Sequence, residues 1–239
     1  MNNSTNKINN SKKPKTSKTP WATKDAMRQV YELNLWGSNN TDFYSGAGSH
    51  ETEIVTPYLS AVSSFLSSFE TPLTVCDLGC GDFNIGKELV KYTKQYIAVD
   101  IVPELITYNT EKFKNINVTF QTLDIAKDAL PTADCVILRQ VLQHLSNDEV
   151  QNVVNKLSNY KYVILTEHLP NGEFIPNKDI ISGQGIRLKK QSGLNILKAP
   201  FNFNIKTAKQ LVAVAINGVN HQNNKFNKGV IVTTLYTIF

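Results

Sequence analysis

The segment Thr74–Gly86, TVCDLGCGDFNIG, constrains the fold of this chain more than any other. A short apolar run leads into two glycines, Gly79 and Gly81, and apolar residues at helical spacing follow. This pattern predicts a buried strand, a tight turn and the start of a helix. Glycines let the backbone bend sharply and let a ligand come close, and the N–H groups at a helix start attract negative or strongly polar groups. Such a turn is typical of a site for a nucleotide-like cofactor.

The residues around the glycines distinguish between cofactors. The dinucleotide fingerprint G-x-G-x-x-G needs a third glycine, and this chain has Asn84 there. It has instead an acid, Asp77, two positions before the first glycine, and this D-x-G-x-G resembles motif I of the class I (Rossmann-like) S-adenosylmethionine-dependent methyltransferases. The resemblance implies that Asp77 organises the turn and the cofactor amino group, while Gly79 and Gly81 pass under the methionine part. The chain departs from the motif at Phe83, where a typical member has glycine.

Charge is distributed unevenly along the chain. The 239 residues, 41% of them hydrophobic, are enough for one sizeable core. Residues 1–20 hold five of the 25 basic residues and no acid, which leaves 20 basic against 20 acidic residues elsewhere. Because nucleic-acid enzymes carry a basic stripe on the folded body, this balance argues against a nucleic-acid partner. We expect residues 1–20 to be a disordered basic tail, with a weak electrostatic tether as the alternative.

The cysteines and the hydropathy pattern bear on the compartment. Cys76, Cys80 and Cys135 lack metal-ligand spacing, and their odd number favours free thiols in a reducing compartment. No apolar run approaches the roughly 18 residues of a membrane span, and no signal-peptide pattern is present. We therefore expect a cytoplasmic protein without a membrane span or a bound metal. The sequence leaves the oligomeric state open.

Two helices are expected before the first strand. Thr23 is placed to cap the first helix, and an apolar stripe from Glu51 to Phe69 predicts the second. We interpret residues 21–70 as a helical cap and residues 71–239 as a methyltransferase domain. In many methyltransferases such a cap closes over the cofactor, and the residues that the resemblance then places beside it are Trp36, Ser45 and Gly46. Ordinary packing within the cap is equally compatible with Trp36.

Acidic residues follow the second and third predicted strands. Asp100 ends the strand Tyr96–Asp100, where a carboxylate can accept hydrogen bonds from both ribose hydroxyls. The alternative is that Asp100 caps the next helix. The third strand begins at Val118 and ends near Asp124. The resemblance places Asp124 against the adenine amino group, and a turn-forming aspartate is the alternative. The backbone groups assigned to the cofactor here belong to Ile101 and Ile125.

Polar residues also follow the fourth and fifth predicted strands, 133–138 and 162–166. Strands separated by helices form parallel units whose carboxyl ends share one edge of the sheet, and ligands of such sheets bind at that edge. The residues expected there are Arg139 and Gln140 after the fourth strand, and Glu167 and His168 after the fifth.

The C-terminal part completes the predicted fold. Two further strands, 211–216 and 230–238, are expected to form an antiparallel hairpin. The resemblance implies an α/β, Rossmann-like class I methyltransferase fold, with a mostly parallel seven-stranded sheet and helices on both faces. The segments RQVLQHLSNDEV, NKDI and APFNF further resemble poorly characterised class I methyltransferases whose genes often accompany glycan or natural-product biosynthesis. Gln140 stands where that group has an acid.

The expected reaction is transfer of the methyl group of S-adenosylmethionine to an acceptor held in line. The cofactor carries the reactivity and the protein supplies positioning. A hydroxyl acceptor benefits from a general base, for which the candidates are His144, His168 and Glu167. Neighbours on a strand point to opposite faces, so we expect only one of Glu167 and His168 to face the cofactor. For each histidine the alternative is a structural role. Arg187, in the long irregular connection, is a candidate for binding an anionic substrate.

These features predict a methyltransferase that O-methylates a small molecule or sugar. The alternatives are N-methylation of a small molecule or protein, and a catalytically idle subunit that keeps the cofactor fold. The acids Asp77, Asp100 and Asp124 argue against an idle subunit, and the missing third glycine argues against an NAD-dependent enzyme.

Overall fold

The structure is a computed structural model that describes residues 20–38, 43–216 and 228–239. The predicted tail, except for Pro20, lies outside the described residues, as do residues 217–227 between the two predicted C-terminal strands. None of the described helices is long and apolar enough to cross a membrane.

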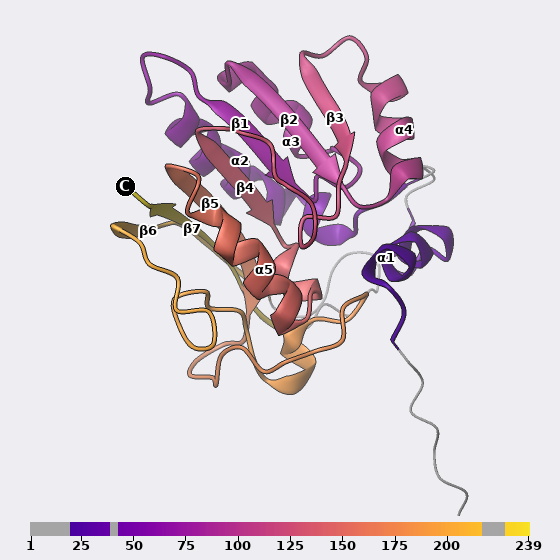
Figure 1. The fold of residues 1–239 in the computed structure, drawn as a ribbon, viewed down its shortest axis with the longest axis vertical. Helices are drawn as coiled ribbons and strands as arrows, with labels where there is room; N and C mark the ends of the chain where they lie inside the picture. The colour runs from indigo at the N-terminus through magenta and orange to yellow at the C-terminus, as the bar shows by residue number, and fades with distance from the viewer. Residues whose placement is uncertain (1–19, 39–42, 217–227) are drawn as a thin grey trace, which may run out of the picture.

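Seven strands form one sheet in the order β3-β2-β1-β4-β5-β7-β6 (Figure 1). The first five are parallel, and β7 runs antiparallel between β5 and β6. Their bounds are β1 Thr74–Leu78, β2 Gln95–Asp100, β3 Val118–Thr122, β4 Cys135–Arg139, β5 Tyr162–Leu169, β6 Thr207–Ile216 and β7 Gly229–Thr237. This arrangement confirms the predicted fold class.

Helices cover both faces of the sheet, with α5 in front and α2 and α3 behind in the view of Figure 1. Along β1, Cys76 packs in the core cluster that contains the buried face of α5, and Val75 packs in the cluster that contains α2. This alternation explains why the central strands are apolar throughout, since both of their faces are buried. The α-helices are α1 Thr23–Glu32, α2 Thr52–Leu66, α3 Gly86–Leu89, α4 Pro103–Lys112 and α5 Asn147–Leu157. Short 3₁₀ turns are η1 Ala47–Ser49, η2 Val90–Tyr92, η3 Leu142–His144 and η4 Arg187–Lys190.

The starts of α1 and α5 differ in how they are capped. Ala22, not the predicted Thr23, is the N-cap of α1, and the Thr23 hydroxyl donates instead to Glu149 at 2.5 Å. Ser146 caps α5 and accepts the Glu149 N–H. The Ser182 hydroxyl accepts the Ser146 N–H and bonds to the Glu149 carboxylate. Through its hydrogen bonds with Thr23 and Ser182, Glu149 of α5 holds α1 and the connection between β5 and β6 in place.

Three strand boundaries differ from the prediction. β6 starts at Thr207, because an edge strand with an exposed first half has no apolar pattern to mark it. β3 ends at Thr122, before the predicted end near Asp124. β5 continues past its last pairing with β4, at Thr166, because β7 pairs with it as far as Leu169. The division into a cap, residues 21–70, and a methyltransferase domain, residues 71–239, stays a prediction.

Candidate functional site

The turn after β1 requires both of its glycines. Gly79 and Gly81 have positive φ angles of 80° and 56°, which residues with a Cβ rarely adopt. A Cβ on Gly79 would lie 2.5 Å from the side chain of Val141, and one on Gly81 would lie 2.4 Å from Ser45 Oγ. The N–H of Gly79 donates to the carbonyl of Val99 in β2 at 2.8 Å. A hydrogen bond to β2 thus fixes the turn, and the side chains of Val141 and Ser45 leave no room for a Cβ at either glycine.

Asp100 and Asn109 hold this turn from the side of β2 and α4. The two carboxylate oxygens of Asp100 accept the N–H groups of Gly81 and Val102, each at 3.1 Å. The fully buried Asn109 donates its amide to the Gly81 carbonyl at 2.8 Å. Burial raises the pKa of Asp100, although backbone hydrogen bonds oppose the shift. Since the N-cap of α4 is Val102, the alternative that Asp100 caps this helix is wrong.

Asp77 and Arg139 place opposite charges at the ends of neighbouring strands. The carboxylate of Asp77, 6% exposed, accepts the Tyr96 hydroxyl at 2.9 Å. Burial raises its pKa to about 7, and the Tyr96 hydrogen bond and the Arg139 charge oppose the shift. The Arg139 guanidinium donates to Ser49 Oγ at 3.1 Å and to the carbonyl of Gly48.

Tyr58, which the sequence analysis did not single out, adds to this end of the site. It projects from α2, and the guanidinium carbon of Arg139 lies 4.7 Å from the centre of its ring. Among the described residues, neither the buried Tyr58 hydroxyl nor Arg139 Nε has a hydrogen-bond partner. Burial lowers the pKa of Arg139. Because buried donors are nearly always satisfied, this pair indicates a missing acceptor.

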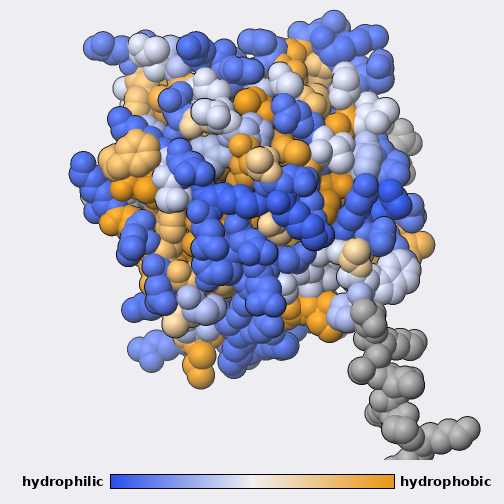
Figure 2. Space-filling view, in the orientation of Figure 1, coloured by the Kyte–Doolittle hydropathy of each residue, from blue (hydrophilic) through white to orange (hydrophobic). Residues whose placement is uncertain are grey.

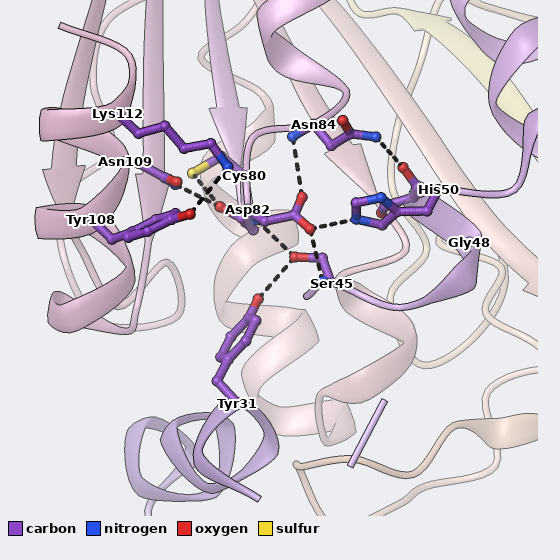
Figure 3. Close-up of polar contacts among 12 residues, drawn as sticks. Tyr31, Ser45, Gly48, His50, Cys80, Asp82, Asn84, Tyr108, Asn109 and Lys112 are labelled. Atoms are coloured by element: carbon purple, nitrogen blue, oxygen red, sulfur yellow. Dashed lines mark hydrogen bonds and ion pairs between the residues drawn. The ribbon is translucent and has the colours of Figure 1, made fainter. Parts of the chain in front are cut away.

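Residues 44–50, which we call the strap, lie across the glycine turn and bind to Asp82 (Figure 3). The carboxylate of Asp82 accepts the Ser45 N–H at 2.9 Å and lies 2.6 Å from His50 Nε2. In return, the Asp82 N–H donates to Ser45 Oγ at 2.8 Å. Burial raises the pKa of Asp82, but the hydrogen bonds from His50 and Ser45 outweigh it and lower the pKa. The sequence analysis missed Asp82, although an acid directly after the second glycine was the available signal.

Asp124 lies in a turn that uses both of its carboxylate oxygens. One accepts the Ala126 N–H at 3.0 Å and the other forms an ion pair with Lys127 at 2.7 Å. This geometry fits the turn-forming alternative. The assignment of Asp124 and Ile125 to the adenine ring stays a prediction.

One pocket at the carboxyl ends of the strands brings the predicted cofactor residues together. Residues of α1, among them Met27 and Tyr31, line it from the side opposite the sheet. The predicted residues that line it are Trp36, Ser45, Asp77, Gly79, Gly81, Asp100, Ile101, Asp124, Ile125, Arg139 and Gln140. Gly46 is not among the lining residues, and a Cβ on it would lie 3.5 Å from Trp36 Cβ. Gln140 has a positive φ of 57°, a strained conformation that is common at functional sites.

Of the three candidate bases, only His144 lines this pocket. Its Nδ1 lies 3.2 Å from the Gly183 carbonyl, and its Nε2 lies 3.3 Å from the Gln143 amide nitrogen. The ring packs 5.1 Å from the Trp36 ring. Burial lowers the pKa of His144 to about 4, so the imidazole is neutral near pH 7.

The structure does not bring Glu167 and His168 to the pocket lining. They lie inside the extended part of β5, paired with β7, rather than beyond the strand end. The Glu167 side chain is 3% exposed, and its carboxylate has no hydrogen-bond partner among the described residues. Burial raises its pKa to about 8, with the charge of Arg187 opposing. Burial lowers the pKa of His168 to about 4.

Arg187, the predicted substrate residue, is also outside the pocket lining. It is 1% exposed, and its guanidinium donates to the carbonyls of Leu142 and Leu145 and to the side chain of Asn147. It therefore fixes the chain between η3 and α5. Within the part of the chain that the structure describes, no group of three His, Cys, Asp or Glu residues is arranged to hold a metal ion.

Comparison with known proteins identifies the domain. Residues 75–160 match the model of a methyltransferase domain, whereas no curated protein sequence matches the chain. The fold resembles the N-methyltransferase NodS from Bradyrhizobium japonicum, solved with S-adenosylhomocysteine (TM-score 0.59, 10% identity, covering 87% of this chain and 98% of NodS). It also resembles magnesium protoporphyrin IX methyltransferase from Synechocystis, solved with bound S-adenosylmethionine (TM-score 0.55, 16% identity, covering 92% and 100%). A third similar structure is TehB from Haemophilus influenzae (TM-score 0.54, 13% identity, covering 81% of this chain and 65% of TehB).

Identities this low establish the fold alone, but the domain match covers the glycine turn and the ends of the first four strands. Residues 75–160 therefore form a methyltransferase domain, and the chain has the fold of class I S-adenosylmethionine-dependent methyltransferases, whose cofactor is S-adenosylmethionine.

Proposed function

We propose that the protein methylates an oxygen of a small molecule or sugar in the cytoplasm, with cofactor and acceptor held in the pocket between the strand ends and α1. The observation that carries this proposal is the cover on the pocket: Tyr31 of α1 bonds to Ser45 of the strap at 3.2 Å, and both line the pocket. A site closed in this way favours an acceptor that fits inside it over a large polymer. The balanced charge of residues 21–239 agrees with a small acceptor, and the three free cysteines agree with a reducing compartment.

The residues at the inner end of the pocket fit the amino-acid part of the cofactor. Asp77 supplies a carboxylate for its ammonium group. Arg139 Nε and the Tyr58 hydroxyl are buried donors without a described partner, and a carboxylate would satisfy both. We propose that these three side chains hold the methionine part.

Asp100 fits the ribose part of the cofactor. Each of its carboxylate oxygens accepts one backbone N–H, and each keeps a further lone pair for a hydroxyl. The same carboxylate would thus shape the glycine turn and bind the sugar. The neighbouring Ile101, with Asp124 and Ile125, completes this part of the proposed site.

When bound, the cofactor supplies a methyl group activated by a sulfonium sulfur. The protein then has to exclude water and hold the acceptor atom in line, which accounts for a large part of the rate in such reactions. Among the candidate bases we retain His144, because it lines the pocket. A pKa of about 4 keeps its imidazole neutral near pH 7 but makes it a weak base. To accept a proton from the acceptor, its Nε2 would first have to give up its contact with the Gln143 amide.

The test is to follow the methyl group. Purified protein would be incubated with methyl-labelled S-adenosylmethionine and an extract of the source cells, and the label measured in the small-molecule, protein and nucleic-acid fractions. We expect label in the small-molecule fraction, with fragmentation mass spectrometry placing it on oxygen. Label on nitrogen would replace this proposal with N-methylation, and label in protein would overturn it. Cofactor binding without any transfer would support the catalytically idle alternative.

The identified acceptor then tests the histidine. His144→Ala should lower the catalytic constant by about 10²–10⁴ while leaving cofactor affinity nearly unchanged. His168→Ala is the matched control, since His168 does not line the pocket. Near-normal rates for His144→Ala would mean that His144 is not the base and that positioning of the two substrates accounts for catalysis.

A further inference from the structure

Two residues that follow Gly81 stand where nucleotide-binding turns carry glycine. Phe83 takes the place of the glycine in the methyltransferase motif, and Asn84 takes that of the third glycine in the dinucleotide fingerprint. Phe83 has a φ angle of 60°, and its fully buried ring packs against the core rings of α4 and β3. The polar side chains on either side of it, Asp82 and Asn84, face the strap instead (Figure 3).

Asp82 and Asn84 hold the strap at both of its ends. Besides its contacts with Ser45 and His50, the Asp82 carboxylate accepts the Asn84 N–H at 3.1 Å. The Asn84 side-chain amide donates to the Ser49 carbonyl at 2.8 Å. Asp82 is 5% exposed, so water competes little for these hydrogen bonds. The strap therefore has a fixed position relative to the glycine turn.

The strap, held in this way, also fixes the guanidinium of Arg139. Nη1 of Arg139 donates to Ser49 Oγ, and Nη2 donates to the Gly48 carbonyl. The strap comes so close to the end of β4 that a Cβ on Gly48 would lie 2.5 Å from Gln140 Oε1. Because a guanidinium is planar and rigid, hydrogen bonds to two of its nitrogens set the direction of the third. That third nitrogen, Nε, is the one without a partner among the described residues.

We propose that Asp82, Asn84 and His50 are positioning residues for the cofactor: they fix the strap, and the strap aims Arg139 Nε at the carboxylate of the methionine part. None of the three lines the pocket, whereas the strap lines it through Ser49, so their effect passes through the strap. The inference rests on the proposed assignment of Arg139 to the methionine part and does not depend on the methyl acceptor.

Calorimetric titration with S-adenosylhomocysteine and with 5′-methylthioadenosine tests this inference, because only the first ligand has the carboxylate. The proteins are the wild type, Asp82→Ala, Arg139→Ala and the double variant. We expect Asp82→Ala to weaken S-adenosylhomocysteine binding about tenfold and to leave methylthioadenosine binding nearly unchanged. In the Arg139→Ala background the same substitution should have no further effect, because no guanidinium is left to orient. A purely structural role for Asp82 would not produce this pattern.

Two more variants complete the set. His50→Ala removes one contact of the strap without changing the glycine turn, and it should weaken S-adenosylhomocysteine binding about threefold. It decides the question if thermal unfolding shows that Asp82→Ala does not fold. Glu53→Ala is the matched control, because Glu53 is an exposed acid in the first turn of α2, just beyond the strap. It should bind both ligands like the wild type.

The purified chain is enough for these titrations. On the face shown in Figure 2, hydrophobic side chains are interspersed with hydrophilic ones and do not gather into one large patch that would indicate a partner.

Different results would overturn the proposal and its premise. If Asp82→Ala weakens both ligands alike, or weakens S-adenosylhomocysteine equally with and without Arg139, then Asp82 supports only the fold and the proposal is wrong. If Arg139→Ala alone binds S-adenosylhomocysteine like the wild type, the assignment of Arg139 to the methionine part is wrong, and the proposal falls with it. The single Arg139 variant thus separates the two failures.

Discussion

Ionisation of the buried Glu167 carboxyl destabilises the folded protein, and this makes stability depend on pH. Its carboxyl is buried without a described hydrogen-bond partner, and burial raises its pKa from 4.5 to about 8. Because the pKa is higher in the folded state, the folded state holds the proton over a range where the unfolded state has lost it. The stabilisation is complete below the unfolded pKa and is lost as pH rises through the folded one. At about 1.4 kcal/mol per pKa unit, the loss reaches about 5 kcal/mol above pH 8.

Replacement of Glu167 by glutamine keeps the size of the side chain and removes this titration. We expect the free energy of unfolding of Glu167→Gln, relative to the wild type, to increase by about 1.4 kcal/mol per pH unit between about pH 5 and pH 8. Urea unfolding of both proteins across this range measures the difference. Glu173→Gln is the control, because Glu173 is exposed on the connection that follows β5. A difference that stays constant with pH would refute the reasoning, since Glu167 would then be ionised or solvated in the folded state.

Three further predictions concern the cofactor and the tail. Asp100→Ala should weaken S-adenosylhomocysteine binding by about 1–3 kcal/mol in a folded protein; unchanged affinity by calorimetry would leave Asp100 with only its role in the glycine turn. Because the pKa of Asp77 is about 7, binding of the cofactor ammonium must displace a proton at lower pH, so affinity should fall up to about tenfold per pH unit below 7. Calorimetry should show no such slope for Asp77→Asn, and a wild type without the slope would contradict the assignment. Deletion of residues 1–19 should leave the melting temperature and the cofactor affinity nearly unchanged, because lysines without apolar partners cannot offset the entropy of ordering a chain.

The strands of the sheet and the site residues at the ends of β1 and β2 could be predicted because each is marked by residues that lie close together in the sequence. The apolar run before Gly79 marks β1, and the spacing from Asp77 through the two glycines marks the turn. Asp100 follows a second apolar run directly. Parallel topology then brings these separate strand ends to one edge.

Residues whose roles depend on distant contacts could not be found in this way. Tyr58 and Asn109 occupy buried positions of α2 and α4, where the helical pattern indicates only packing. Their polar atoms become informative once the Arg139 guanidinium and the Gly81 carbonyl lie beside them.

Two predicted site residues lie away from the pocket lining. Glu167 was expected at the edge of the sheet where the parallel strands end, and Arg187 was a candidate substrate residue in the long connection after β5. Pairing with β7 extends β5 beyond that edge, and Arg187 turns inward to the carbonyls after η3. Neither event leaves a local mark on the sequence, since both depend on segments far along the chain.

The measurement that tests the central claim most directly is calorimetric titration with S-adenosylhomocysteine and with 5′-methylthioadenosine, which lacks the amino-acid part. We expect the wild type to bind S-adenosylhomocysteine the more tightly. Tyr58→Phe should weaken that binding by about 1 kcal/mol or more, the usual effect of a lost hydrogen bond to a charged group, and leave methylthioadenosine binding unchanged. Equal affinities for the two ligands in the wild type, or binding of NAD in place of both, would contradict the assignment of this pocket to S-adenosylmethionine.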